Sequence, residues 1–410
     1  MFIFEEEINF IKVKKCTFFY NNLLIYAFKI GFLLLLILNL YLLLFDKTYF
    51  LDKKELYIYK NYILDCKQLK RFYSNEKNVN NNITYFSIIL PVYNNEKYIG
   101  SSIFSIINQS FSNYEIIIIN DFSNDGTQNI IQNLQTQFST IKIINHSSNL
   151  GIYTSRVEGV LNSNGIYIIF IDSDDFFINP FLFQKLYEFN SKSNFDIIEF
   201  IVLYQEEGKN NLILPKDHKL NHFHNFKEKN IYQPELSNIL FYEPGTLDYS
   251  EIICRTVWSK IIRKDILLKT IKFIGYDNYK KLYFNYGEDT IMNVVNFQYA
   301  KNYTNINIPG YMYNIRKFSI SHSDIGNEND IIICKNLYIY FKLFYKYIKY
   351  FNKNRNYFFF ELNNFKNFLI KLKDNNVTEY ILETKIFLID IMRDNNTSNE
   401  LRNLIFKLLK

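Results

Sequence analysis

Residues 166–175 read Ile-Tyr-Ile-Ile-Phe-Ile-Asp-Ser-Asp-Asp, and this stretch decides the fold class of the chain. Six consecutive apolar residues, most of them β-branched, predict a strand that is buried on both faces. Open α/β sheets bind ligands at the carboxyl ends of such strands, where the three carboxylates stand. Because side chains alternate along a strand, we expect Asp172 and Asp174 to point the same way. Such a pair would suit Mg²⁺ or Mn²⁺, and a solvated turn is the alternative.

The segment from residue 86 to about residue 204 alternates strand patterns with helix patterns. Apolar runs predict strands at residues 86–92, 114–120, 141–144 and 196–204, in addition to the strand before Asp172. Between them, apolar residues recur at helical spacing, as in Ile99, Ile103 and Ile106. This alternation predicts an α/β fold with a mostly parallel sheet flanked by helices.

The composition favours a folded enzyme or binding domain over a nucleic-acid-binding protein. With 48% hydrophobic residues in 410, the chain can bury a substantial core. The net charge of +6 is spread along the chain without a basic block, so we expect no nucleic-acid partner. The four cysteines contain no Cys-x-x-Cys pair, which argues against a cysteine-based zinc site.

Residues 23–45 are almost wholly apolar and are long enough to span a bilayer as a helix. Lys29 lies near the start of this segment, where its amine can reach the membrane interface. A cleavable signal peptide is the rival interpretation, but no small-x-small cleavage site follows. We therefore predict a short tail at 1–22, a signal anchor at 23–45 and a stem at 46–85. This organisation predicts a single-pass membrane protein of the Golgi or endoplasmic reticulum, with its main domain in the lumen.

Several short motifs follow in chain order, and their order is more specific than any one of them. They are Pro-Val-Tyr-Asn at 91–94, Asn-Asp-Phe-Ser-Asn-Asp-Gly-Thr at 120–127, Asn-Leu-Gly at 149–151, Arg156, the acidic run 172–175, and Gly-Glu-Asp at 287–289. Together they resemble the family-2 glycosyltransferases over roughly residues 86–325. The resemblance implies a GT-A, Rossmann-like fold. It divides the chain into a nucleotide-sugar-binding half (86–205), an acceptor-binding half (206–329) and a helical C-terminal extension (330–410).

The resemblance also implies a donor site. Tyr93 would stack on the nucleotide base, and Asp121 would accept a hydrogen bond from N3–H of a uracil. Phe122 replaces the usual glycine, so the turn must avoid a positive φ or accept strain. Arg156 would contact the diphosphate or orient the acidic motif, unless it is only a solvated or salt-bridged side chain. The residues assigned to the nucleotide or substrate are Pro91, Tyr93, Asn94, Glu96, Asp121, Arg156, Asp172, Ser173 and Glu288.

The remaining assignments concern the metal and the base. The resemblance makes Asp174 a ligand of a divalent cation, Mn²⁺ or Mg²⁺, with Asp175 behind it and His322 as a further ligand. Asp289 would be the general base that takes the proton of an acceptor hydroxyl. Acidic residues are also favoured at a helix start by the helix dipole, which is the structural alternative for Glu288 and Asp289. Trp258 could pack on a sugar ring or simply belong to the core.

The predicted function is an inverting glycosyltransferase, of hexosyl or N-acetylhexosaminyl type. It would move a sugar from a nucleotide diphosphate donor, UDP by preference, to a hydroxyl of a glycan, glycoprotein or glycolipid. Two alternatives stay open at this point. One is a catalytically inactive GT-A module that binds glycans or nucleotides, which the departures at Asn120 and Phe122 permit. The other is a cytosol-facing synthase that acts on a lipid phosphate.

Overall fold

The computed structural model describes residues 83–206, 212–213, 230–233, 256–280, 283–285, 287–316 and 329–351, with single positions at 389, 393, 402 and 406. The predicted tail, the anchor at 23–45 and nearly all of the stem lie outside these residues. His322 and most of the predicted C-terminal extension also lie outside them. None of the helices within the described ranges combines the length and apolar character needed to cross a bilayer.

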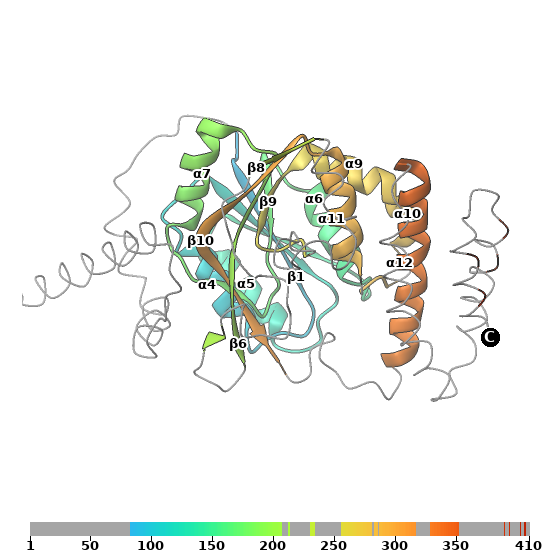
Figure 1. The fold of residues 1–410 in the computed structure, drawn as a ribbon. Helices are drawn as coiled ribbons and strands as arrows, with labels where there is room; N and C mark the ends of the chain where they lie inside the picture. The colour runs from blue at the N-terminus through green and yellow to red at the C-terminus, as the bar shows by residue number, and fades with distance from the viewer. Residues whose placement is uncertain are drawn as a thin grey trace, which may run out of the picture. The chain divides into compact units, whose positions relative to one another are not determined.

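Strands and helices alternate in the first half of the domain, which confirms the sequence prediction (Figure 1). Strands β1 and β2 begin and end at the predicted residues, and all four strands of this half are parallel. The elements are β1 (Phe86–Val92), α4 (Ile99–Ile107), β2 (Tyr114–Asn120), α5 (Thr127–Gln137), β3 (Ile141–Asn145), α6 (Ile152–Leu161) and β4 (Tyr167–Phe170).

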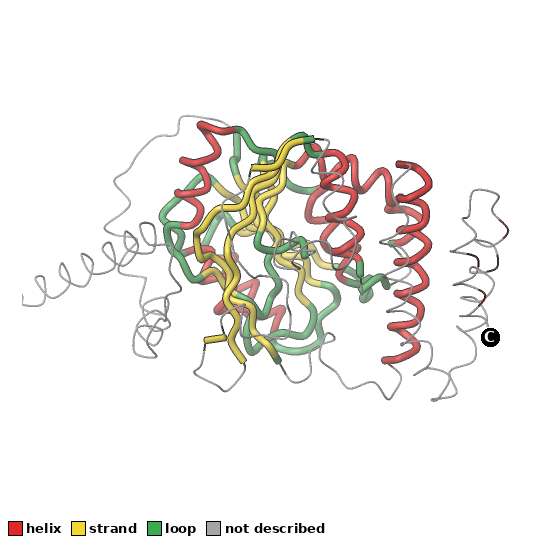
Figure 2. Tube along the Cα trace, in the orientation of Figure 1, coloured by secondary structure: helices red, strands yellow, loops and turns green. Residues whose placement is uncertain are grey.

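The second half adds strands to the same sheet and helices to both of its faces. The elements are β5 (Phe176–Phe177), α7 (Leu182–Ser193), β6 (Ile197–Glu206), β7 (Leu212–Ile213), β8 (Asn230–Tyr232), β9 (Lys260–Arg263), α9 (Lys264–Ile274), α10 (Tyr276–Tyr279), α11 (Glu288–Tyr299), β10 (Asn302–Ile315) and α12 (Asn329–Phe351). The main path of the sheet runs β3-β2-β1-β4-β9-β6-β10-β5. Figure 2 shows the strands in yellow and the helices in red.

The prediction of a mostly parallel sheet holds only in part, because the sheet as a whole is mixed. Strand β9 lies between β4 and β6 and is antiparallel to both. The short strands β5, β7 and β8 also pair antiparallel, whereas β6 and β10 are parallel. The alternating pattern of residues 86–204 correctly predicts the parallel part. The sheet is mixed because strands from beyond residue 206 complete it.

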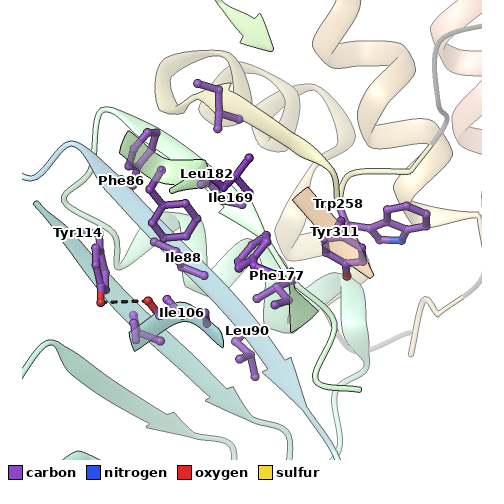
Figure 3. Close-up of a cluster of buried hydrophobic side chains, with 14 of the residues drawn as sticks. Phe86, Ile88, Leu90, Ile106, Tyr114, Ile169, Phe177, Leu182, Trp258 and Tyr311 are labelled. Atoms are coloured by element: carbon purple, nitrogen blue, oxygen red, sulfur yellow. Dashed lines mark hydrogen bonds between the residues drawn. The ribbon is translucent and has the colours of Figure 1, made fainter. Parts of the chain in front are cut away.

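Two apolar layers cover the two faces of the sheet, and β1 contributes to both. Ile88 and Leu90 pack with α4, α5 and α7 in one cluster, while Ile89 packs with α6, α9 and α11 in the other. This division follows from the alternation of side chains along a strand. In the first cluster, the Tyr114 hydroxyl donates to the Ile106 carbonyl at 3.1 Å (Figure 3). Helices on both faces leave the ends of the strands as the place for a ligand.

Candidate donor-binding and catalytic site

The predicted site residues gather at one edge of the sheet. Strands β1, β2 and β4 are parallel neighbours, so their carboxyl ends meet at that edge. The loops that follow these strands carry Tyr93, Asp121 and Asp172. Ion pairs also bring the first turn of α11, with Glu288 and Asp289, to this edge. The structure therefore brings the residues predicted to bind the donor close to the residue predicted to be the general base.

Pro91 lies inside β1, where a missing N–H usually disrupts a sheet. Ile171 N–H donates to the Ile89 carbonyl at 3.1 Å, so alternate residues of β1 face β4 on that side. The pairing with β4 ends at Ile89 and Phe170, two residues before Pro91. Pro91 therefore removes no ladder bond, and β1 continues to Val92, directly before the loop that carries Tyr93.

Two predicted nucleotide residues, Asn94 and Glu96, bind the neighbouring loop in this structure. The Asn94 side chain accepts from Asn124 N–H at 2.8 Å, and Glu96 Oε2 accepts from Gly126 N–H at 2.6 Å. In return, Ser123 Oγ accepts from Asn94 N–H at 3.0 Å. These bonds join the loops after β1 and β2 into one unit. Direct contact of either side chain with a nucleotide stays a prediction.

Two exposed aromatic side chains stand on this joined unit. Tyr93 is 46% exposed and Phe122 is 54% exposed. Phe122 has φ +66°, so the residue that replaces the usual glycine adopts the strained conformation and does not avoid it. Strain of this kind is typically held in place where a loop serves a site. Phe122 thus adds a second aromatic face that the sequence reasoning did not assign.

Asp121 is buried and its carboxylate already receives three donors. Oδ1 accepts from Leu150 N–H at 2.7 Å and from His146 Nδ1 at 2.7 Å, and Oδ2 accepts from Gly151 N–H at 2.8 Å. A carboxylate offers about four acceptor positions, so one position on Oδ2 remains. Gly151 has φ +90°, a conformation that directs its N–H to Asp121 and that few other residues adopt.

The acidic run after β4 forms a turn, not a continuation of the strand. Strand β4 ends at Phe170, and Asp175 N–H donates to the Asp172 carbonyl at 3.0 Å. The prediction that Asp172 and Asp174 share one side by strand alternation is therefore wrong, because the alternation stops before them. Ser173 faces the first loop, where its Oγ accepts from Asn95 Nδ2 at 2.7 Å.

The turn is buried, unlike a solvated loop. Asp175 accepts from the Tyr311 hydroxyl and from Asn314 N–H, each at 2.8 Å, which ties the turn to β10. Burial and the nearby Asp174 and Asp172 raise the pKa of Asp175 well above its usual range. Asp174 forms an ion pair with Arg316. Burial raises the pKa of Asp174 to about 6, although Arg316 opposes that rise.

Arg156 joins the acidic turn to helix α11. Its side chain is 2% exposed, and its guanidinium contacts Asp172 Oδ1 at 2.8 Å and Glu288 Oε1 at 2.6 Å. The alternative of a solvated surface arginine is therefore wrong. Of the two predicted roles, the geometry fits the orientation of the acidic motif, and a contact with diphosphate stays a prediction.

Glu288 and Asp289 open helix α11, as the sequence predicts. Gly287 precedes them with φ +80°, and a side chain there would collide with Tyr340 of α12. Burial and the neighbouring Asp289 raise the pKa of Glu288 to about 8, against the effect of Arg156. Burial also raises the pKa of Asp289, whose Oδ1 accepts from Thr290 N–H at 2.7 Å. Both acids are therefore stronger bases than ordinary surface carboxylates.

Comparison with known proteins identifies the fold that carries this site. The family model described as "Glycosyl transferase family 2" matches residues 87–267. Residues 87–267 belong to glycosyl transferase family 2. This confirms the resemblance drawn from the motifs, and the first five of those motifs lie within the matched range.

Relatives of this glycosyltransferase domain are found in several bacteria. A cholesterol galactosyltransferase of Borreliella burgdorferi is 28% identical over 45% of this chain and 49% of its own length. An uncharacterized glycosyltransferase of Haemophilus influenzae is 40% identical over 26% of this chain and 42% of its own. The chain therefore matches less than half of either relative. The crystal structure of S. aureus TarS 1–349 in complex with UDP-GlcNAc has a TM-score of 0.48 at 18% identity, over 78% of this chain and 83% of that one.

The structure pairs two of the predicted site acids with basic residues that sequence reasoning missed. His146 lies against Asp121, and Arg316 lies against Asp174. Neither residue stands in a recognisable motif, so only the folded structure pairs them with the acids. Trp258 stacks on Tyr311 at 5.1 Å between ring centroids and is buried, so it belongs to the core (Figure 3).

The residues of the acidic turn can be tested for their fit to a divalent cation. Within the described ranges, no three His, Cys, Asp or Glu side chains converge as a complete metal site would require. Mg²⁺, however, is commonly held by one or two carboxylates together with substrate phosphates. The Asp174 carboxylate already attracts a cationic group, Arg316, in this structure. The donor set of the domain therefore fits a cation that arrives with a diphosphate.

Proposed function

We propose that this domain transfers a sugar from a UDP-linked donor to an acceptor hydroxyl, with inversion at the anomeric carbon. The observation that carries the proposal is the buried Arg156 bridge between Asp172 and Glu288. This bridge joins the acidic turn after β4 to the first turn of α11, where Asp289 stands. A donor-side acid and an acceptor-side base therefore share one site, as direct displacement requires.

The Asp121 carboxylate supports a uracil-containing donor. Three of its acceptor positions are filled by protein donors, and the remaining one on Oδ2 can receive a single N–H. The uracil ring offers one such group at N3. Tyr93 and Phe122 supply exposed aromatic faces on the loops beside Asp121. Stacking on such faces contributes about 1–3 kcal/mol per base in nucleotide sites generally.

Asp289 is the proposed general base. As the acceptor oxygen attacks the anomeric carbon, its proton passes to the Asp289 carboxylate and the bond from that carbon to the diphosphate oxygen breaks. The nucleoside diphosphate leaves with the bonding electron pair. A base with a raised pKa takes the proton more readily near neutral pH. Glu288, held by Arg156, would position the acceptor.

Asp174 is the proposed ligand of a divalent cation, Mn²⁺ or Mg²⁺, with His322 as a proposed second ligand. When bound, such a cation offsets the charge of the departing diphosphate. The burial of several carboxylates in one turn supports this proposal, because a cation would relieve their mutual repulsion. Once the cation is bound, Arg316 would leave Asp174 and pair with the phosphates of the donor.

The remaining parts of the proposal concern the acceptor and the location. The apolar segment at 23–45 supports a membrane-anchored enzyme of the Golgi or endoplasmic reticulum that faces the lumen. A glycan, glycoprotein or glycolipid hydroxyl is the proposed acceptor, and a hexose or N-acetylhexosamine is the proposed sugar.

A panel of UDP- and GDP-linked sugars tests the proposal directly. We expect one UDP-sugar to be hydrolysed in the presence of Mn²⁺ and to bind in calorimetry. Chelation of the metal with EDTA should abolish both signals, and the GDP-sugars should give neither. Binding without any turnover would support the inactive module instead. Hydrolysis of GDP-sugars alone would contradict the assignment of Asp121.

A further inference from the structure

The most distinctive contact outside the predicted residues is made by His146, which follows strand β3. Its side chain is 4% exposed, although His is common on protein surfaces. Nδ1 lies 2.7 Å from Asp121 Oδ1, and Nε2 lies 3.1 Å from Glu158 Oε2. The ring therefore stands between two carboxylates, one at the end of β2 and one on α6.

The chemistry of the two partners determines the protons on the ring. An ionised carboxylate only accepts hydrogen bonds, so each ring nitrogen must carry a hydrogen to bond both acids. His146 is then an imidazolium, with one positive charge between two negative ones. Burial opposes this charge, but Asp121 and Glu158 outweigh it and raise the pKa of His146 above its usual 6.5.

The surroundings of the ring reinforce this assignment. Glu158 also accepts from the Tyr276 hydroxyl at 2.7 Å, so its second oxygen is satisfied by α10. Tyr283 stands near Asp121, and burial, with a smaller effect of that acid, raises the pKa of its hydroxyl. The titratable groups that face the network are thus two carboxylates and two tyrosines that stay neutral near pH 7. None of these four groups carries a positive charge.

We propose that His146 is a positioning residue of the donor site, whose positive charge holds Asp121 in place to receive the base of the donor. This inference rests on the proposed function, because it takes Asp121 as the group that binds the base. Loss of one ring proton from His146 would disturb the network, whichever of the two nitrogens loses it. A neutral ring would turn a lone pair toward Asp121 or toward Glu158, and both are negatively charged. Donor binding would weaken as a result.

Calorimetric titration of UDP-glucose in the presence of Mg²⁺, from about pH 6 to about pH 9, tests the inference. The diphosphate of UDP-glucose does not titrate in this range, and the uracil N3–H begins to ionise only at its upper end. A fall in affinity that begins at lower pH therefore comes from the protein, and His146→Gln measures the contribution of the ligand. We expect the affinity to fall by about tenfold as His146 loses its proton, the effect of losing one charge-assisted hydrogen bond. The NMR signals of the ring, identified by their absence in His146→Gln, report the same midpoint independently.

Three variants separate positioning from a purely structural role. His146→Gln should bind weakly with little pH dependence. Glu158→Gln keeps an acceptor but removes a charge, so we expect normal affinity at low pH and a midpoint shifted to lower pH. Lys142→Gln, which changes an exposed charge on β3, is the matched control and should leave the midpoint unchanged.

The possible failures can be told apart. Absence of binding at every pH for UDP-glucose, for UDP itself and for the other UDP-sugars of the panel would overturn the proposed UDP donor itself. Binding that is independent of pH, or an unchanged midpoint in Glu158→Gln, would overturn the role of His146 and leave the proposed donor intact. Because the pH dependence of the unmodified protein and its shift in Glu158→Gln are measured without His146→Gln, poor folding of that variant would not prevent the decision.

Discussion

Two clusters of carboxylates stand at the same edge of the sheet, and they are balanced in different ways. In the cluster around Asp121, one histidine and two backbone N–H groups satisfy the acid. The cluster around the acidic turn contains Asp172, Asp174, Asp175, Glu288 and Asp289, and all of these except Asp175 pair with or face Arg156 or Arg316. The first cluster is satisfied by its own neighbours, whereas the second holds more carboxyl groups than arginines.

In the proposed function, the first cluster recognises the donor base and the second carries out the chemistry. A satisfied carboxylate with one remaining acceptor position can select a ligand by a single hydrogen bond. Buried carboxylates that repel one another have raised pKa values, which favours proton transfer and the binding of a cation. The following predictions test the second cluster against the first, in order of expected effect.

Removal of the proposed base should have the largest effect. In Asp289→Asn we expect turnover to fall by about 10²–10⁴-fold, because the amide cannot accept the proton of the acceptor hydroxyl. Donor binding, measured by calorimetry, should stay unchanged. Asp277→Asn, on the exposed surface of α10, is the control. Retained turnover in Asp289→Asn would refute the base assignment.

Loss of the buried bridge should destabilise the fold. Arg156→Met leaves Asp172 and Glu288 without their shared cation, which typically costs about 3–5 kcal/mol of unfolding free energy. Urea denaturation followed by circular dichroism measures this loss. Above about pH 8, where Glu288 is ionised, adding Glu288→Gln should recover part of this loss, since the neutral amide needs no cation.

Lys269→Met is the matched control for this experiment. It breaks an exposed pair with Asp265 at 3.3 Å, for which we expect a change of about 0–1 kcal/mol. Equal losses in Arg156→Met and Lys269→Met would show that the bridge is no more important than a surface ion pair.

Removal of the proposed cation ligand should affect donor binding alone. In Asp174→Ala we expect the Mn²⁺-dependent part of donor affinity, about tenfold or more, to disappear. Calorimetry with and without Mn²⁺ measures the difference, and Glu188→Ala on the exposed surface of α7 serves as control. If the dependence on Mn²⁺ persists in Asp174→Ala, the metal must be bound elsewhere.

The smallest effect concerns the pH dependence of stability. The pKa of Glu288 rises from 4.5 to about 8 on folding, so between these values the folded state holds a proton that the unfolded chain releases. Its contribution is complete below about pH 4.5 and is lost as the pH rises through about 8. Denaturation at several pH values should therefore show a shallower decline in Glu288→Gln. An unchanged slope would contradict the raised pKa.

Much of the fold could be predicted because its signals are local. The strands at 86–92 and 114–120 are continuous apolar runs, and the structure confirms their bounds. The start of α11 could be predicted because Gly287 and two acids mark it. The four residues of β9 are too few to show a period, so nothing in the sequence predicted a strand between β4 and β6.

The partners of the site residues could not be predicted, because they depend on distant pairings. Arg156 and Glu288 are 132 residues apart in the chain, and only the packing of α6 near α11 joins them. His146 is a single residue in a polar segment, and its importance appears only when β2, β3 and α6 are placed together. The sequence was enough to predict that the site lies at this edge of the sheet. It was not enough to predict which charged residues pair there.

Strand β9 has a consequence for the order in which the domain can form during synthesis. It is made after both of its neighbours, β4 and β6, yet it separates them in the finished sheet. A nascent chain that ends before residue 260 therefore has two unpaired strand edges facing one another. The nucleotide-binding strands cannot complete their sheet until the ribosome has delivered part of the second half. A truncated protein cut at residue 205 would expose those edges and would tend to aggregate.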